Sequence, residues 1–166
     1  MRDNIFLIGF MGAGKSTIAR SLRDLYAMRL IEMDEQIERQ EGMKISRIFK
    51  EKGEAYFRAL ETALLEGLRC EMNTVVSCGG GVPMRQCNVD AMRQSGRIVY
   101  LSAKPETIFA RVRHAHNRPL LEGNMNVAYI EKLLQERLPK YLAAADVIVE
   151  TDGRSAREIC RDIVRQ

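Results

Sequence analysis

The stretch GFMGAGKST, residues 9–17, decides the fold of this chain. It matches the phosphate-loop pattern GxxxxGK(S/T) at every fixed position, and it lies between an apolar run at 5–8 and a helical spacing of apolar residues over 15–27. Glycines let such a loop curl so that its N–H groups point at phosphate oxygens, and the helix that follows adds its positive dipole end. A plain glycine-rich turn would give little reason for Lys15 and Ser16 to follow the last glycine.

The chemistry of phosphate loops assigns roles to individual side chains. The lysine reaches the β- and γ-phosphates, and the serine hydroxyl can ligate Mg²⁺. We therefore predict that the chain binds ATP with Mg²⁺, with Lys15 also acting in catalysis and Ser16 as a metal ligand. The predicted nucleotide-binding residues of the loop are Gly12, Ala13, Gly14, Lys15, Ser16 and Thr17.

Outward from the loop, short apolar runs alternate with helical patterns. Strands are predicted at 5–8, 30–33, 74–78, 98–101 and 147–149, and helices at 15–27, 34–40, 45–52, 53–71 and 126–145. Pro105 is placed to begin a further helix and Ser155 to cap the last one. This alternation predicts one α/β domain over residues 1–166, with a five-stranded, mainly parallel sheet flanked by helices. Ligands bind such sheets at the carboxyl ends of the strands.

Composition fits a globular protein of the cytoplasm. Hydrophobic residues make up 46% and charged residues 29% of the 166. The longest charge-free N-terminal stretch, residues 4–14, is shorter than the roughly 20 residues of a spanning helix, and because it runs into the phosphate loop we do not interpret it as an export signal. The four cysteines show neither CxxC pairing nor zinc-ligand spacing, which predicts reduced thiols in a cytosolic chain.

The charge balance points to small anionic ligands. Net charge is +4, with 19 arginines against 7 lysines. The arginines are scattered along the whole chain, without interleaved aromatic residues or a recognisable nucleic-acid motif. We predict a small-molecule partner and no nucleic-acid or membrane partner.

Polar residues after the predicted strands are candidates for a second site. Asp34 is either a helix N-cap or a carboxylate that orients and deprotonates a substrate hydroxyl, and the residues alone leave these about even. Arg58 shares a helix face with Glu54 and Glu61, a spacing that by itself favours a solvated salt-bridge cluster. The glycine run 79–81 is a flexible turn or a place where something must approach bare backbone closely, and we favour the second.

Residues 111–125 have the composition of a mobile lid. His114 and His116 have no nearby cysteine or third histidine, so we interpret them as exposed lid residues rather than metal ligands. Arg118 is a lid charge or an arginine finger for the γ-phosphate. Farther along, Pro139 is expected to bend or break the helix that carries Arg137.

Several motifs together resemble one family. GFMGAGKST (9–17), EMD (32–34), GEAYFR (53–58), GGG (79–81), RPLL (118–121) and RLPKY (137–141) are similar, in order and spacing, to shikimate kinases over nearly the whole chain. The resemblance implies a three-layer P-loop kinase fold with a mobile lid at about 111–125 and a substrate-binding region at about 32–61. It implies transfer of the γ-phosphate of ATP to the 3-hydroxyl of shikimate, by a monomer.

The resemblance also implies roles for particular residues. Catalysis would use Lys15, Asp34 and Arg118, with Arg111, Arg118 and Arg154 at the nucleotide. Glu32 departs from the family's usual Asp, which serves Mg²⁺ through water; Glu keeps the charge and adds one methylene. Shikimate would be bound by Asp34, Arg58, Gly79, Gly80, Gly81 and Arg137.

Three alternatives stay open at this point. Another hydroxy-acid kinase, such as a gluconate kinase, would also use a phosphate loop and an arginine clamp. A nucleotide-binding regulator without transfer activity would not need the second set of polar residues. An RNA- or DNA-directed P-loop protein is disfavoured by the lack of a basic stripe.

Overall fold

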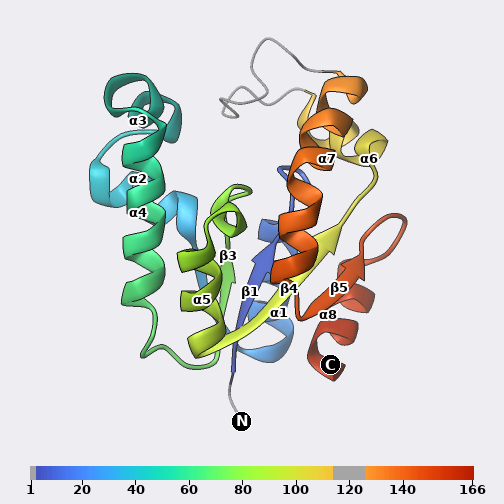
Figure 1. Cartoon of the computed structure of the whole chain (residues 1–166). Helices are drawn as coiled ribbons and strands as arrows, with labels where there is room; N and C mark the ends of the chain where they lie inside the picture. The colour runs from blue at the N-terminus through green and yellow to red at the C-terminus, as the bar shows by residue number, and fades with distance from the viewer. Residues whose placement is uncertain (1–2, 114–125) are drawn as a thin grey trace.

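The computed structural model describes residues 3–113 and 126–166. Five parallel strands form one sheet in the order β2-β3-β1-β4-β5 (Figure 1). This confirms the predicted α/β fold with its five-stranded parallel sheet. The strands are β1 Asn4–Ile8, β2 Arg29–Glu32, β3 Thr74–Ser77, β4 Gly96–Ser102 and β5 Val147–Glu150.

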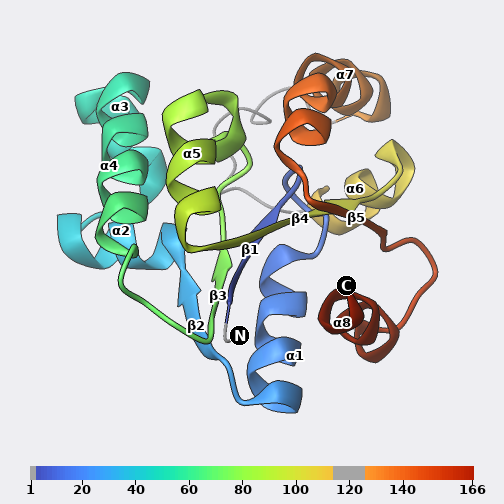
Figure 2. The same ribbon diagram turned by 60° about the horizontal axis from the view of Figure 1, so that its bottom comes forward.

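Helices cover both faces of the sheet, which gives three layers. Helices α1 and α8 lie together on one face, and α5 and α7 lie on the other, with α4 beside α5 (Figure 2). The α-helices are α1 Lys15–Tyr26, α2 Met33–Glu41, α3 Ile45–Lys52, α4 Glu54–Gly67, α5 Gln86–Ser95, α6 Pro105–Val112, α7 Val127–Ala144 and α8 Ala156–Arg165, and a 3₁₀ turn η1 spans Val82–Met84.

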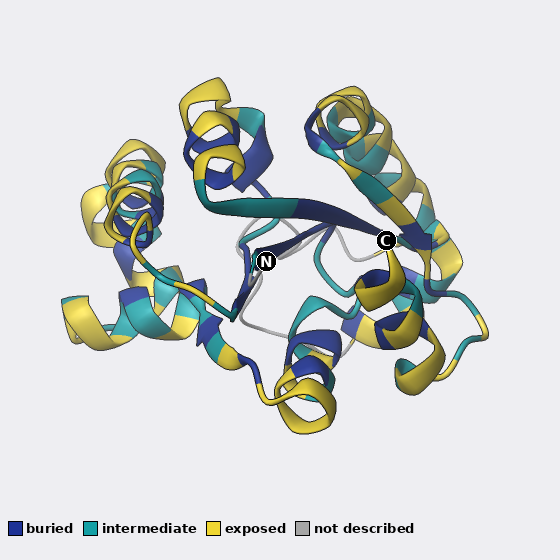
Figure 3. Cartoon of the chain, turned by 90° about the horizontal axis from the view of Figure 1, so that it is seen from below, coloured by how far each residue is buried: buried dark blue, intermediate teal, exposed yellow. Residues whose placement is uncertain are grey.

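The central strand β1 supplies side chains to two separate cores. Ile5 and Leu7 pack with α1 and α8, whereas Phe6 and Ile8 belong to the cluster on the opposite face. Every residue of β1 is buried, as expected for a parallel strand covered on both sides. Figure 3 shows the same pattern in the helices, whose buried sides face the sheet.

Side-chain caps begin two helices, and the sequence predicted the first of them, at Ser155. Ser155 Oγ accepts from the Glu158 backbone N–H at 3.2 Å, and Glu158 Oε2 accepts from the Ser155 N–H at 3.1 Å, which is a complete capping box for α8. Asn126 Oδ1 accepts from the Tyr129 N–H at 2.8 Å and caps α7. Pro105 begins α6 as predicted.

Pro139 does not end helix α7, so the predicted break is wrong. The helix continues through Pro139 to Ala144. Because Pro139 and the preceding turn at Gln135 are exposed, water can satisfy the carbonyl that loses its partner. Tyr141 and Ala144 are buried and anchor the last turn to the core.

One further helix end and one whole helix differ from the predictions. Helix α4 ends at Gly67, earlier than the predicted residue 71. Helix α5 was not predicted, because its polar sequence QCNVDAMRQS buries one narrow face that includes Asn88.

None of the described helices is long and apolar enough to cross a membrane. Most of the predicted lid, with His114, His116 and Arg118, lies outside the described residues.

Candidate active site

The phosphate loop joins β1 to α1 at the carboxyl edge of the sheet. Gly12 and Gly14 have φ of 78° and 99°, in the left-handed region, and Gly14 is the N-cap of α1. The Ala13 N–H donates to the Phe10 carbonyl at 3.1 Å. The loop therefore ends on the first turn of a helix, the arrangement that suits an anion.

Helix α6 packs directly on this loop. A β-carbon at Gly12 would lie 2.6 Å from Cγ1 of Val112, so only glycine fits beneath the helix. Arg111 Nη1 donates to the Gly12 carbonyl at 2.9 Å, which places the Arg111 side chain at the loop. Arg154 lies in the loop between β5 and α8, where it donates to the Glu150 carbonyl at 3.0 Å and pairs with Asp162.

Lys15 contacts the loop that it follows. Its Nζ donates to the carbonyl of Gly9 at 2.6 Å and to that of Phe10 at 3.1 Å. These bonds hold the ammonium group against the loop main chain, and Lys15 lines the cavity described below. A phosphate at the loop would meet both the amides and this charge.

Ser16 and Glu32 bring two oxygen groups together beside the loop. Ser16 Oγ donates to Glu32 Oε2 at 3.2 Å, and it lies 3.5 Å from Ser77 Oγ. Glu32 Oε1 lies 3.6 Å from Nη2 of Arg20, and it is buried without a hydrogen bond from any residue that the structure describes. A hydroxyl and a carboxylate are hard oxygen donors, which suit Mg²⁺. The described residues contain no group of three or more acidic, histidine or cysteine side chains that could hold a metal by themselves.

Arg58 is positioned by carboxylates on its own helix. Nη1 donates to Glu61 Oε1 at 2.8 Å and Nη2 to Glu54 Oε1 at 3.1 Å. The Glu61 side chain is completely buried, so this is no solvated surface cluster. Burial raises the pKa of Glu61 to about 7, against the opposing effect of the Arg58 guanidinium.

Arg137 reaches the same region from α7. Its Cζ lies 5.7 Å from the centroid of the Phe10 ring, within cation–π distance. Its Nη1 is buried without a hydrogen-bond partner among the described residues. Because a buried guanidinium N–H without an acceptor is unfavourable, this atom marks a place where an anion would bind well.

The glycine run lies between these charged groups. A β-carbon at Gly79 would lie 2.5 Å from Glu61 Oε2, one at Gly80 would lie 3.0 Å from Arg137 Nη1, and one at Gly81 would lie 2.5 Å from Arg58 Nη1. The sequence analysis favoured a close approach to the bare main chain as the reason for the three glycines. In the structure, the side chains that approach the main chain this closely are those of Glu61, Arg137 and Arg58.

Asp34 lies in the first turn of α2, where Glu32 is the N-cap, so the N-cap alternative for Asp34 is wrong. Its Oδ1 would lie 3.4 Å from a β-carbon at Gly79. The carboxylate therefore faces the start of the glycine run, close to the buried Glu61.

One cavity of about 590 Å³ connects the phosphate loop to the arginines. Residues that sequence reasoning did not assign also shape it, among them the aromatic rings of Phe49 and Phe57, whose centroids lie 5.9 and 5.3 Å from Arg58 Cζ. The predicted site residues that line the cavity are Gly12, Gly14, Lys15, Ser16, Thr17, Glu32, Asp34, Arg58, Gly79, Gly80, Gly81, Arg111 and Arg137.

The sheet order, the phosphate loop and the adjoining arginine site define a P-loop kinase of small molecules. The sequence model of the shikimate kinase family matches residues 11–166, and the chain belongs to that family.

Individual relatives agree with the family assignment. The shikimate kinase of Dehalococcoides mccartyi strain 195 is 42% identical over 163 residues, 98% of this chain and 92% of the relative. The structure of shikimate kinase from Acinetobacter baumannii in complex with shikimate has a TM-score of 0.94 at 34% identity, covering 99% of this chain and 92% of that one. A gluconokinase from Sinorhizobium meliloti, with a TM-score of 0.58 and 18% identity, shares the fold alone.

Proposed function

We propose that this protein transfers the γ-phosphate of ATP to the 3-hydroxyl of shikimate, forming shikimate 3-phosphate and ADP. The observation that carries the proposal is the single cavity in which a phosphate loop faces two arginines from α4 and α7. One ligand of the cavity would be a triphosphate and the other a small carboxylic acid. Membership of the shikimate kinase family and the likeness to a shikimate complex favour shikimate over gluconate.

The nucleotide would occupy the loop side of the cavity. The loop amides and the α1 N-terminus would bind the β- and γ-phosphates, and Lys15 would exchange its bonds to the Gly9 and Phe10 carbonyls for bonds to phosphate. Arg111, held to the Gly12 carbonyl, stands beside this position. Arg118 and Arg154 remain predicted nucleotide contacts from the resemblance.

Mg²⁺ would be held by Ser16 directly and by Glu32 through water. Their oxygens fit the ion, and the buried Glu32 Oε1, which lies 3.6 Å from Arg20 Nη2, accepts no hydrogen bond from the described residues. When bound, the ion supplies neutralisation of charge on the phosphates. Glu32 reaches Ser16 across its longer side chain, so the metal position is compatible with Glu in place of the usual Asp.

The acid would occupy the arginine side of the cavity. Arg58 and Arg137 would bind its carboxylate, and the glycine run would lie against its ring. Asp34 would accept the hydrogen bond of the attacked hydroxyl and take its proton as the oxygen attacks the γ-phosphorus and the bond to ADP breaks. Positioning and charge neutralisation would supply most of the acceleration. Cytoplasmic location and a monomeric state remain predictions from the sequence.

The decisive test measures ADP release with shikimate, with gluconate and with no acceptor. We expect turnover with shikimate alone, and phosphorus NMR should show a phosphate monoester as the product. Lys15→Ala should abolish turnover, and Arg58→Ala should raise KM for shikimate far more than KM for ATP. ADP release that neither acceptor changes would refute the kinase proposal. Faster turnover of gluconate than of shikimate would show that gluconate, and not shikimate, is the substrate.

A further inference from the structure

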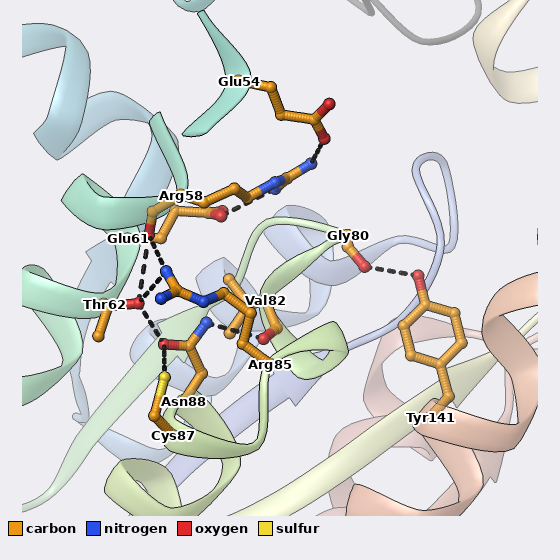
Figure 4. A network of polar contacts seen from close by, with 10 residues as sticks. All are labelled: Glu54, Arg58, Glu61, Thr62, Gly80, Val82, Arg85, Cys87, Asn88 and Tyr141. Atoms are coloured by element: carbon orange, nitrogen blue, oxygen red, sulfur yellow. Dashed lines mark hydrogen bonds and ion pairs between the residues drawn. The ribbon is translucent and has the colours of Figure 1, made fainter. Parts of the chain in front are cut away.

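A network of polar side chains ties helix α4 to the segment that follows the glycine run (Figure 4). Thr62 stands one turn after Arg58 on α4, and its Oγ1 lies 2.7 Å from Asn88 Oδ1 on α5. Asn88 Nδ2 donates to the carbonyl of Val82 at 2.9 Å, and Val82 directly follows Gly81. The network thus joins three segments that are distant in sequence.

The direction of each hydrogen bond follows from the chemistry of the groups. The bond to the Val82 carbonyl makes Nδ2 of Asn88 a donor, so Oδ1 is the acceptor that faces Thr62. A hydroxyl has one proton, and at 2.7 Å Thr62 uses it for Asn88 rather than for the Arg58 carbonyl at 3.2 Å. Arg85 Nη1 donates to that same Arg58 carbonyl at 3.2 Å and to Thr62 Oγ1 at 3.0 Å.

Burial makes the inner part of the network rigid. Asn88 has an exposed fraction of 0%, so water cannot replace a lost partner. A buried amide strongly favours the one arrangement that satisfies it. The turn of α4 at Arg58 and the main chain after Gly81 are therefore held at one distance from each other.

The separation between α4 and the main chain after Gly81 sets the position of Arg58, the arginine that would bind the acid. The Arg58 guanidinium lies against Gly81, with no room for a β-carbon between them. The network holds the main chain on both sides of this contact: at Arg58 itself and at Val82, one residue after Gly81. Among the residues that the structure describes, the hydrogen bonds of this network join α4, the segment after Gly81 and α5, and none of them reaches residues 9–17 of the phosphate loop.

We propose that Thr62, Asn88 and Arg85 are positioning residues for the carboxylate-binding side of the site. They act through Arg58 and the glycine run, and they set the affinity for the acid without setting the affinity for ATP. This inference rests on the proposed function, because it takes shikimate as the ligand of Arg58.

The test compares Thr62→Val, which keeps the shape and removes the hydroxyl, with Thr62→Ser, which keeps the hydroxyl. Arg85→Ala is a second, exposed variant that removes the outer part of the network without a buried substitution. Gln86→Ala is the matched control. It removes a side-chain hydrogen bond to Asp90 at 2.9 Å on the exposed surface of α5, the helix that carries Asn88. Shikimate binding is measured by calorimetry, and KM is measured for both substrates.

We expect Thr62→Val and Arg85→Ala to raise Kd and KM for shikimate about five- to tenfold, with KM for ATP unchanged. Thr62→Ser and Gln86→Ala should behave like the parent protein. Unchanged shikimate binding in both Thr62→Val and Arg85→Ala, or an equal loss for shikimate and ATP, would overturn the inference. If the parent protein itself shows no shikimate-dependent ADP release, the proposed function fails instead, so the two failures are distinct.

Discussion

The guanidinium of Arg58 lies against the main chain of Gly81 so closely that a β-carbon there would lie 2.5 Å from Nη1 and 2.6 Å from Cζ. Glu61 and Glu54 hold the guanidinium from the other side. Arg58 is therefore confined between its own helix and the glycine run. Its position depends on a residue that carries no side chain.

Gly81→Ala is expected to displace Arg58 and weaken binding of the acid. The added methyl group would overlap the guanidinium, which would have to leave its bond with Glu61. We expect KM for shikimate to rise about tenfold or more, with KM for ATP within twofold of the parent value. Gly67→Ala is the control, because nothing lies within 4 Å of a β-carbon there. Equal KM values for parent and Gly81→Ala would show that Arg58 can move without consequence.

Tyr141→Phe tests the support of the glycine run from α7. The Tyr141 hydroxyl donates to the Gly80 carbonyl at 2.7 Å, and its ring stacks on Tyr100 with centroids 5.1 Å apart. Phenylalanine keeps the stacking and removes the donor, so we expect a loss of about 1–2 kcal/mol in the free energy of unfolding. Urea unfolding measures this loss.

The matched control for Tyr141 is Tyr56→Phe. Tyr56 donates to Glu41 at 2.7 Å in an exposed pair, where water replaces the lost bond. Tyr56→Phe should leave the free energy of unfolding within about 0.5 kcal/mol of the parent. The same loss in both variants would contradict a special role for the buried hydroxyl.

The pKa of Glu61, raised by burial from 4.5 to about 7, predicts a pH dependence of stability. Between these values the folded chain holds a proton that the unfolded chain has lost, so the free energy of unfolding falls as pH rises. The decrease from this group is on the order of 3 kcal/mol. Glu61→Gln cannot titrate and should lose this part of the slope. Urea unfolding of the parent and of Glu61→Gln, each at pH 5 and pH 8, measures how much the free energy of unfolding changes with pH in the two proteins. The same change in both would refute the raised pKa.

Glu32→Gln is expected to weaken the response to Mg²⁺. The substitution keeps the size of the side chain and removes the charge that faces Ser16 and Arg20. We expect the Mg²⁺ concentration for half-maximal rate to rise at least about tenfold, as is usual for groups around a metal ligand. Binding of ATP without Mg²⁺, measured by calorimetry, should not weaken. An unchanged Mg²⁺ requirement would place the metal away from Glu32.

The sequence was sufficient for the sheet and for the phosphate loop because their signals are local. The run before Gly9 is apolar enough for a buried strand, and the spacing of Glu54, Arg58 and Glu61 correctly brings these charges together on one helix. Which partner lies against each glycine depends on how α4 and α7 pack on the sheet, and no local pattern contains that information.

The same reason explains the errors. Helix α5 packs through the buried Val89, Ala91 and Met92 and through Asn88, which bonds Thr62 and Val82. The partners of Asn88 lie on other segments, so no local pattern predicts these contacts. Pro139 predicts a helix break from local rules, but burial of Tyr141 carries α7 past it. Tyr141 belongs to the family-like motif at 137–141, and only the structure connects it to Gly80.

Asp34→Asn separates proton transfer from orientation of the substrate. Asparagine keeps an acceptor oxygen near Gly79 but cannot take a proton from the attacked hydroxyl. If Asp34 is the base, kcat should fall about 100-fold or more, with KM for shikimate changed only a few-fold. Asp90→Asn is the control, an exposed carboxylate that accepts only from Gln86 among the described residues. A near-normal kcat for Asp34→Asn would leave Asp34 with orientation alone, because a loose phosphoryl-transfer transition state demands little removal of the proton before the phosphorus–oxygen bond to ADP breaks.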